Sequence, residues 1–374
     1  MNRYFLITSL VFLTSCASQS PSTQTAQTVE ALIKKSPPQL SFVPRGFDLS
    51  QAPSRIVFGS CFDQDLDAHI WTEMAKTNPD LVIMMGDNIY SSKPHKRPFF
   101  DQYRKMEKIE AYRTLRQSVP FLAVWDDHDY GVSDGGTDNP DKAESKRAFS
   151  FHYPYIKDST LLDQPGLYHS KMFGGVRQGK SKRSPVNKSL HVIVLDTRWN
   201  KSPWNQQESV DGSKVLLPSA DKKTTLLGEA QWAWLEDQLK ESSDVKILVS
   251  SMQVLAESHG FERWGQFPHE RERLLNLISR IKPKNLILLS GDRHFASISK
   301  LDLPAYGPLY EFTSSPLNTP KGNITESQSV YQFPIFVKEN FGLLDIDLNN
   351  QKALIEIRSA KNEVIKSVEL KLKK

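Results

Sequence analysis

Cysteine is nearly absent from this sequence. The 374 residues contain only Cys16 and Cys61, which excludes a scaffold held together by several disulfides. If Cys16 is covalently modified, as argued below, Cys61 has no partner within the chain, although an exported protein meets an oxidising compartment. Two interpretations of Cys61 stay open. It is either a metal ligand or a small buried hydrophobic side chain.

Strong net charge and internal repeats are also lacking, and no apolar run reaches membrane length. The formal net charge of +5 on 374 residues is too small to indicate a nucleic-acid partner, and no nucleic-acid-binding module is evident. A mildly basic surface suits anionic substrates, which is weak evidence on its own. With 39% hydrophobic and 24% charged residues, the composition is typical of a chain with a globular core.

The N-terminus has the features of an export signal. Arg3 precedes an apolar run over residues 4–13 that is too short to span a bilayer as a mature helix. Residues 13–16 (LTSC) resemble the lipobox of bacterial lipoproteins, which implies cleavage before Cys16 and acylation of that residue. We predict a lipoprotein signal peptide at 1–15, the lipidated Cys16 and a flexible tether over 16–50, and a folded domain over 51–374.

This N-terminus also predicts where the protein is located. Ala17 and Ser18 follow Cys16, and no Asp does. By the sorting pattern of bacterial lipoproteins, this implies an exported protein anchored to the outer membrane through its lipid. An ordinary signal peptide or a short membrane anchor is the alternative.

The domain begins with alternating strand and helix patterns. Apolar, β-branched runs at residues 55–61, 80–87 and 121–125 predict buried strands, and helical spacing over 66–76 and 99–117 predicts the helices between them. This order is typical of a parallel α/β sheet. Further strands are predicted at 190–195, 245–250 and 285–290, further helices at 142–151, 228–239 and 268–281, and antiparallel C-terminal strands at 341–348, 353–359 and 364–372.

Four of the predicted strands end in residue types that bind metals. They end at Cys61, at Asp87 with Tyr90, at Asp126 to Asp129, and at Asp292 with His294. The carboxyl ends of parallel strands share one edge of a sheet, so these side chains are expected to meet there. Thiolate and phenolate suit a trivalent or soft metal and carboxylates suit a hard divalent one, which indicates two different metals. The alternative is a set of separate polar turns.

The ordered set of motifs resembles the alkaline phosphatase D family, a branch of the calcineurin-like metallophosphoesterases. The matching segments are GSC at 59–61, GDNIY at 86–90, WDDHDYG at 125–131, DTR at 196–198, WGQFPHERERL at 264–274 and GDRH at 291–294. The resemblance implies an α/β fold, namely a four-layer metallophosphoesterase-like sandwich with mixed sheets and a C-terminal antiparallel part.

The same resemblance implies a ligand set. Asp87 matches the carboxylate that bridges two metals, and Cys61 and Tyr90 match ligands of iron (Fe3+). Asp292 and His294 match further ligands, and calcium is the implied second metal. Asp127 and His128 align with an Asn-His pair of the wider superfamily, so this chain has Asp where the superfamily has Asn.

These residues together predict a metal-dependent hydrolase of phosphate esters, a phosphodiesterase or alkaline phosphatase in which a metal-activated hydroxide attacks phosphorus in line. His128 is predicted to protonate the leaving oxygen and Asp129 to orient His128. Arg293 is the better of two candidate phosphate-binding arginines because it sits between two predicted ligands, whereas Arg198 is expected to form a surface ion pair. Asp126 is left out of the site. The rival hypothesis is a catalytically silent binding or scaffold lipoprotein, and the complete ligand set argues against it.

Overall fold

The computed structural model describes residues 40–91, 99–157, 160–175, 188–209, 212, 214–322 and 324–374. The predicted signal peptide, the lipobox and the tether as far as residue 39 lie outside these residues, as does most of a basic loop at 178–188. Within the described part of the chain, no helix combines the length and the apolar character needed to cross a membrane.

Two six-stranded mixed sheets form the centre of the domain. In the first sheet, β1, β2 and β3 are parallel and a run of antiparallel strands continues from β1. Its order is β14 (Val364–Lys371), β13 (Lys352–Ser359), β12 (Asn340–Asp347), β1 (Arg55–Gly59), β2 (Leu81–Met85) and β3 (Phe121–Val124).

In the second sheet, the four central strands are parallel and the two edge strands are antiparallel to their neighbours. Its order is β10 (Ser297–Leu303), β11 (Gly307–Thr313), β9 (Leu286–Ser290), β8 (Val245–Ser250), β5 (Leu190–Val194) and β4 (His169–Phe173). A separate hairpin consists of β6 (Asn205–Glu208) and β7 (Lys214–Leu217).

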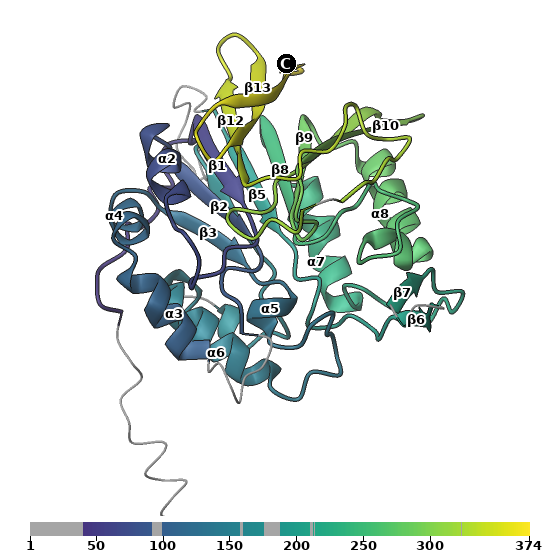
Figure 1. The fold of residues 1–374 in the computed structure, drawn as a ribbon. Coiled ribbons are helices and arrows are strands. Elements are labelled where there is room, and N and C mark those ends of the chain that lie inside the picture. The colour runs from purple at the N-terminus through teal and green to yellow at the C-terminus, as the bar shows by residue number, and fades with distance from the viewer. Residues whose placement is uncertain are drawn as a thin grey trace, which may run out of the picture. The chain divides into compact units, whose positions relative to one another are not determined.

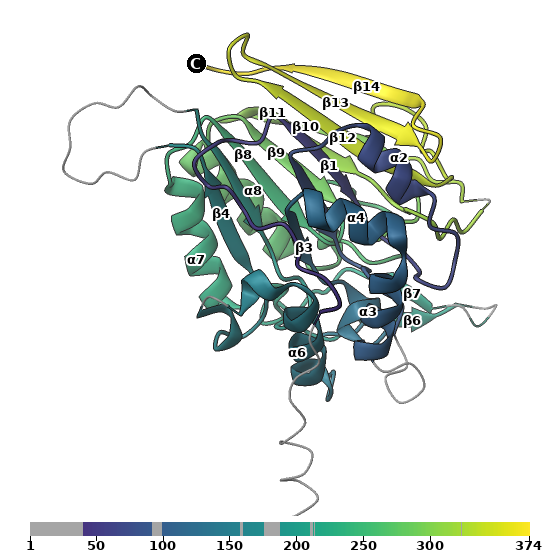
Figure 2. The ribbon, with the colours of Figure 1, turned by 90° about the vertical axis from the view of Figure 1, so that its left-hand side faces the viewer.

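The sheets pack face to face with helices outside them, as Figure 2 shows. The alternation of side chains along β8 explains the layering, because Ile247 and Val249 join the core shared with the first sheet whereas Leu248 joins a core with the outer helices. Those outer helices are α7 (Glu229–Lys240) and α8 (Pro268–Ile281). The predicted four-layer sandwich with mixed sheets is therefore confirmed.

The first sheet is covered by α2 (Ile70–Lys76), α3 (Phe99–Lys108), α4 (Glu110–Ser118) and α6 (Lys142–His152). The single helix predicted over 99–117 is wrong, because Ile109 is extended (φ −69°, ψ 109°) and separates α3 from α4. This break lets α3 pack on α6 while α4 packs on α2. Single turns of 3-10 helix occur at η1 (Pro154–Ile156), η2 (Thr160–Leu162) and η3 (Trp264–Gln266).

Residues 40–50, predicted as part of the tether, pack on the domain instead. The compact unit runs from Leu40 to Lys374. Phe42 is buried, and the backbone N–H of Arg45 donates to the carbonyl of Arg116 at 2.7 Å. The segment contains apolar residues such as Phe42 and Phe47, but the partners that they contact lie far along the chain and no local pattern identifies them.

The three predicted C-terminal strands are confirmed, and each of their ends lies within one residue of its predicted position. These strands complete the first sheet. β12 pairs antiparallel with β1, so that Arg55 lies opposite Asp345. Figure 1 shows these last strands in yellow beside the purple of β1. The parallel strands that carry the predicted ligands are thus divided between two sheets, and the expectation of one shared sheet edge is wrong.

Candidate metal centre

The predicted ligands lie where strands of both sheets end. Cys61 follows β1, Asp87 follows β2, and Asp292 and His294 follow β9. All four have left-handed backbone conformations, with φ of 58°, 50°, 66° and 53° respectively. Side chains other than glycine seldom adopt this conformation, and such strain is concentrated at functional sites. These four backbone conformations direct the side chains toward a common region, and each costs some conformational energy.

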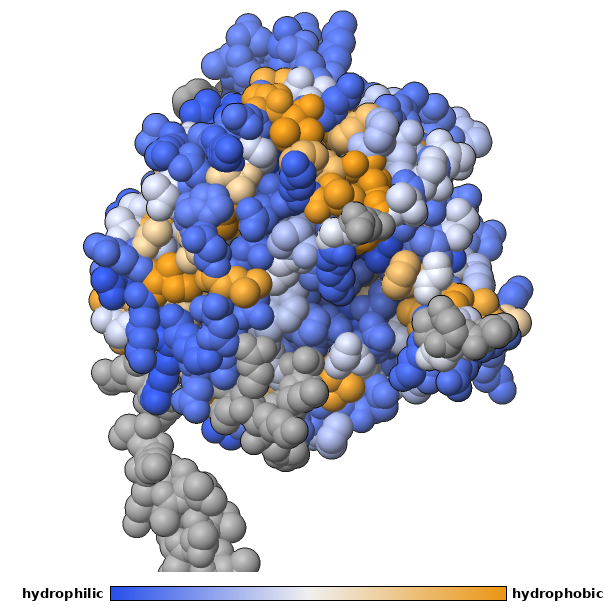
Figure 3. Space-filling model, in the orientation of Figure 1, coloured by the Kyte–Doolittle hydropathy of each residue, from blue (hydrophilic) through white to orange (hydrophobic). Residues whose placement is uncertain are grey.

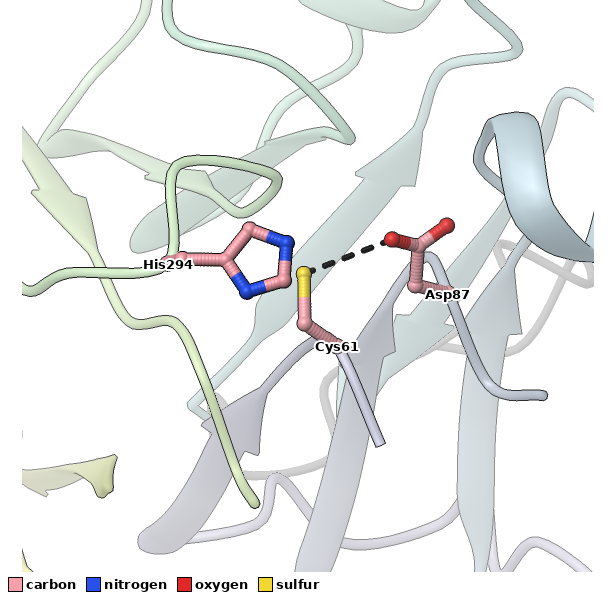
Figure 4. A group of neighbouring side chains, drawn as sticks. All are labelled: Cys61, Asp87 and His294. Carbon is pink, nitrogen blue, oxygen red and sulfur yellow. Dashed lines mark hydrogen bonds between the residues drawn. The ribbon is translucent and has the colours of Figure 1, made fainter. Parts of the chain in front are cut away.

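A first group consists of Cys61, Asp87 and His294, whose potential ligand atoms all lie within 4.8 Å of one another. Figure 4 shows His294 and Asp87 on opposite sides of the Cys61 thiol, with Cys61 Sγ 3.5 Å from Asp87 Oδ2. His294 Nδ1 lies 2.6 Å from the carbonyl oxygen of Thr319, which fixes the proton on Nδ1 and leaves Nε2 as the acceptor. Burial lowers the pKa of His294 to about 3, so its ring is the neutral form that binds metals.

A second group shares Asp87 with the first and adds Asp127 and His128. Asp127 and His128 belong to α5 (Asp127–Tyr130), a single turn after β3. The backbone N–H of His128 donates to Asp87 Oδ1 at 3.1 Å. Burial, followed by the nearby charge of Asp127, raises the pKa of Asp87 well above its usual range. Buried carboxylates this close repel one another unless a cation or a proton lies between them.

Tyr90 and Asp292 lie beside these groups. The hydroxyl of Tyr90 is 3.2 Å from Thr319 Oγ1, and its ring lies against His128 with centroids 4.1 Å apart. Burial and the charges of Cys61 and Asp87 raise the pKa of Tyr90. Asp292 lines the same cavity as Asp87, and its backbone carbonyl lies 3.7 Å from Cys61 Sγ. The structure thus brings all six predicted ligands into one region.

Asp129 does not contact His128 in the way the sequence suggested. Its Oδ1 accepts from the backbone N–H of Asp126 at 2.5 Å, and its Oδ2 accepts from the backbone and side-chain nitrogens of Asn88 at 3.1 and 2.5 Å. His128 Nδ1 has no hydrogen-bond partner among the described residues. The predicted orienting contact is therefore wrong. The carboxylate of Asp129 instead stabilises the start of α5 and the loop after β2.

Arg198 was expected at the surface and is instead fully buried. Its Nε donates to Asp126 Oδ1 at 2.5 Å, and its two terminal nitrogens donate to the two oxygens of Glu262 at 2.6 Å each. Trp204 Nε1 donates to Glu262 as well, at 2.8 Å. A guanidinium matches a carboxylate in this two-point geometry, which suits a buried ion pair. Arg198 therefore holds Asp126, and with it the start of α5, against the segment containing Glu262.

Asp134 and Glu262, which no local pattern indicated, form a third acidic group with Asp127. The backbone N–H of Asp134 donates to Asp127 Oδ2 at 2.9 Å. Burial tends to raise the pKa of Asp127, but His128, Arg198 and this N–H hold it below the usual range. Both oxygens of Glu262 already accept hydrogen bonds from Arg198, so this one carboxylate of the group is paired with a protein cation.

A cavity of about 220 Å³ opens above the two ligand groups. Arg293 lines it, and its Nη2 lies 2.5 Å from Glu326 Oε2. The predicted residues in its lining are Asp87, Asp127, His128, Asp292, Arg293 and His294, and the lining residues that sequence analysis missed are Ser133, Asp134, Lys214, Leu216, Gly260, Phe261, Glu262, Lys321 and Ile324. The missed residues lie on loops and on β7, where no local pattern signals a shared wall.

Comparison with known proteins now decides the family. A family model described as PhoD-like phosphatase matches residues 56–364. The chain belongs to this family. Alkaline phosphatase D of Bacillus subtilis (strain 168) is 26% identical over 280 residues, which cover 66% of this chain and 45% of that protein. The present chain thus matches less than half the length of this relative of the PhoD-like family.

Two solved structures share the fold. The structure of PhoD aligns with a TM-score of 0.62 at 19% identity, covering 90% of this chain and 70% of the other. The purple acid phosphatase PPD1 from yellow lupin (Lupinus luteus) seeds aligns with a TM-score of 0.53 at 12% identity, covering 87% and 55%. The resemblance to the alkaline phosphatase D family and the metallophosphoesterase-like architecture are both confirmed for this PhoD-like chain.

Proposed function

We propose that this PhoD-like protein is a metal-dependent hydrolase of phosphate esters. The observation that carries the proposal is the pair of ligand groups that share Asp87 beneath one cavity. Two groups with a common carboxylate are the arrangement expected of a two-metal phosphoesterase. Membership of a phosphatase family supports the same activity. The match to alkaline phosphatase D supports it as well.

The donor set fits two metals of different character. The first group offers a thiol, a carboxylate and a neutral imidazole, and the phenol of Tyr90 lies beside it. The second group offers carboxylates and His128. Soft or strongly donating ligands suit iron, and carboxylate oxygens suit calcium, so we assign Cys61, Asp87, Tyr90, Asp292 and His294 to iron (Fe3+). Asp87 and Asp127 are assigned to the second metal, calcium.

When bound, these cations would polarise the phosphoryl group and lower the pKa of a water molecule. Side chains of the cavity would supply the proton for the leaving group and further positive charge. His128 lines the cavity and its Nδ1 has no hydrogen-bond partner among the described residues, which supports its assignment as the group that gives a proton to the leaving oxygen of the ester. Arg293 contributes positive charge where the phosphate oxygens would lie. Asp129 acts on catalysis through the position of α5.

The test measures metal content and turnover on the same preparation. The full-length protein is loaded with iron and calcium, its metals are quantified by plasma mass spectrometry, and hydrolysis of 4-nitrophenyl phosphate is compared with that of bis(4-nitrophenyl) phosphate at alkaline pH. We expect stoichiometric metal and turnover of at least one ester. A protein that binds both metals and hydrolyses neither ester would instead be the catalytically silent lipoprotein, and one that binds no metal would contradict the assigned centre.

We also propose that the protein is exported and anchored to the outer membrane through lipid on Cys16. The support is the sequence of residues 1–18, with its basic residue, short apolar run and Cys16. The test compares membrane fractions of cells that make the natural protein or Cys16→Ser, with Cys61→Ser as the matched control. We expect only Cys16→Ser to appear in the soluble fraction. A Cys16→Ser protein that remains with the outer membrane would refute lipid anchoring.

A further inference from the structure

One part of the cavity wall is apolar and belongs to neither ligand group. It consists of Leu216, Gly260, Phe261 and Ile324. Phe261 is 58% exposed and is the one aromatic residue among the exposed large hydrophobic side chains of the described residues. Figure 3 shows hydrophobic side chains gathered over the β6–β7 hairpin, next to a hydrophilic area at the centre of this face. An exposed aromatic ring that lines a cavity is available to pack against a ligand in that cavity.

Several contacts hold the exposed ring of Phe261 in place. The guanidinium of Arg293 lies over Phe261, 4.7 Å from the ring centroid. Glu326 fixes that guanidinium at 2.5 Å and itself accepts from the hydroxyl of Tyr331 at 2.6 Å. The carbonyl of Phe261 accepts from Gln266 Nε2 at 3.0 Å. A ring held in this way loses little conformational entropy when a ligand packs against it.

The β6–β7 hairpin joins this ring to the rest of the wall. The backbone N–H of Leu216 donates to the carbonyl of Gly260 at 2.9 Å, which links β7 directly to the residue before Phe261. Lys214 of the same strand lines the cavity as well, as does Lys321. The cavity thus has ligand groups on one part of its lining and an apolar surface, bordered by cations, on another.

We propose that Phe261, together with Leu216, binds the organic group of the phosphate ester and makes the enzyme selective for esters with an aromatic or flat apolar group. This inference rests on the proposed phosphoesterase function. The same 220 Å³ cavity is lined by members of both ligand groups and by Phe261 and Leu216, so the group attached to a phosphate held there can pack against these two side chains. The apolar wall excludes water from a flat group and offers a ring face for stacking.

The test compares Phe261→Ala and Phe261→Tyr with the natural protein, all full-length and metal-loaded, on phenyl phosphate and methyl phosphate. Stacking of a flat group on an aromatic side chain corresponds to roughly tenfold in affinity. We therefore expect Phe261→Ala to lower kcat/KM for the phenyl ester on the order of tenfold, with less than about a twofold change for the methyl ester. Phe261→Tyr should retain the natural selectivity. Val364→Ala, an exposed residue on β14, serves as the control that changes neither.

Binding of phenylphosphonate and methylphosphonate, measured by calorimetry on the same proteins, separates this inference from the proposed function. Neither compound is an ester, so a protein without turnover can still be tested. A preference for phenylphosphonate that disappears in Phe261→Ala supports the binding surface even if hydrolysis is absent. Equal losses for phenyl and methyl compounds, or no loss for either, would overturn it.

Discussion

The buried Arg198 allows a quantitative test of what holds the site together. In Arg198→Met, the side chain keeps its approximate length but no longer neutralises Asp126 and Glu262, whose side chains are 1% and 5% exposed. Removing one partner of a buried ion pair costs about 3–5 kcal/mol, because the remaining charge is left buried without a partner. We expect the free energy of unfolding to fall by about that amount, which corresponds to a shift of roughly 1 M in the urea midpoint.

Urea unfolding followed by tryptophan fluorescence provides the measurement. Arg280→Met is the matched control, since Arg280 is 61% exposed and pairs with Glu236 at 3.0 Å, and exposed pairs contribute only about 0–1 kcal/mol. Adding Asp126→Asn and Glu262→Gln to Arg198→Met should recover much of the loss. If Arg198→Met unfolds at the same urea concentration as Arg280→Met, the buried ion pairs do not stabilise the site.

Three further predictions concern the ligands, the proton donor and acid stability. Asp87→Asn should lose both metals in mass spectrometry while Asp80→Asn, at an exposed turn, retains them; full occupancy in Asp87→Asn would contradict the shared-ligand assignment. His128→Ala should keep metal and lose about 10²–10⁴ in kcat, most for esters with poor leaving groups; equal losses across leaving groups would exclude proton donation. Burial lowers the pKa of His169 to about 4, so below about pH 6.5 only the unfolded chain gains this proton and stability falls toward pH 4. His169→Gln should reduce the loss of unfolding free energy between pH 7 and pH 5, as measured by urea unfolding. A loss as large as that of the natural protein would contradict this role of His169.

Local patterns in the sequence predicted most of the strands, and they singled out six candidate metal ligands that lie in one region of the structure. Continuous apolar runs that end in Cys, Asp or His mark buried strands whose carboxyl ends carry chemistry. Such runs do not reveal which sheet each strand joins, because a strand buried on both faces looks the same in either. The division of β1–β3 and β5, β8 and β9 between two sheets depends on pairings such as that of β1 with β12.

Partners far apart in the sequence explain the errors at the site. Arg198 looked like a surface residue because Glu262 lies 64 residues away, and nothing near Arg198 indicates a buried carboxylate. Asp129 was paired with His128 because they are adjacent, whereas its partner Asn88 lies 41 residues earlier. The wall formed by Phe261 and β7 could not be predicted for the same reason, since hairpin and loop meet only in the folded chain.

The pairing of β1 with β12 has a consequence for how the protein is made. Arg55 and Asp345, joined by a 2.6 Å contact, are separated by 290 residues. β1 lies inside the first sheet, between β2 and β12, so that sheet cannot be completed until nearly the whole chain has been synthesised. Contacts between such distant residues slow folding. Until β12 arrives, β1 presents a row of unpaired N–H and C=O groups on which other chains can add strands. A chain shortened before residue 340 would keep that edge permanently and would be prone to aggregate.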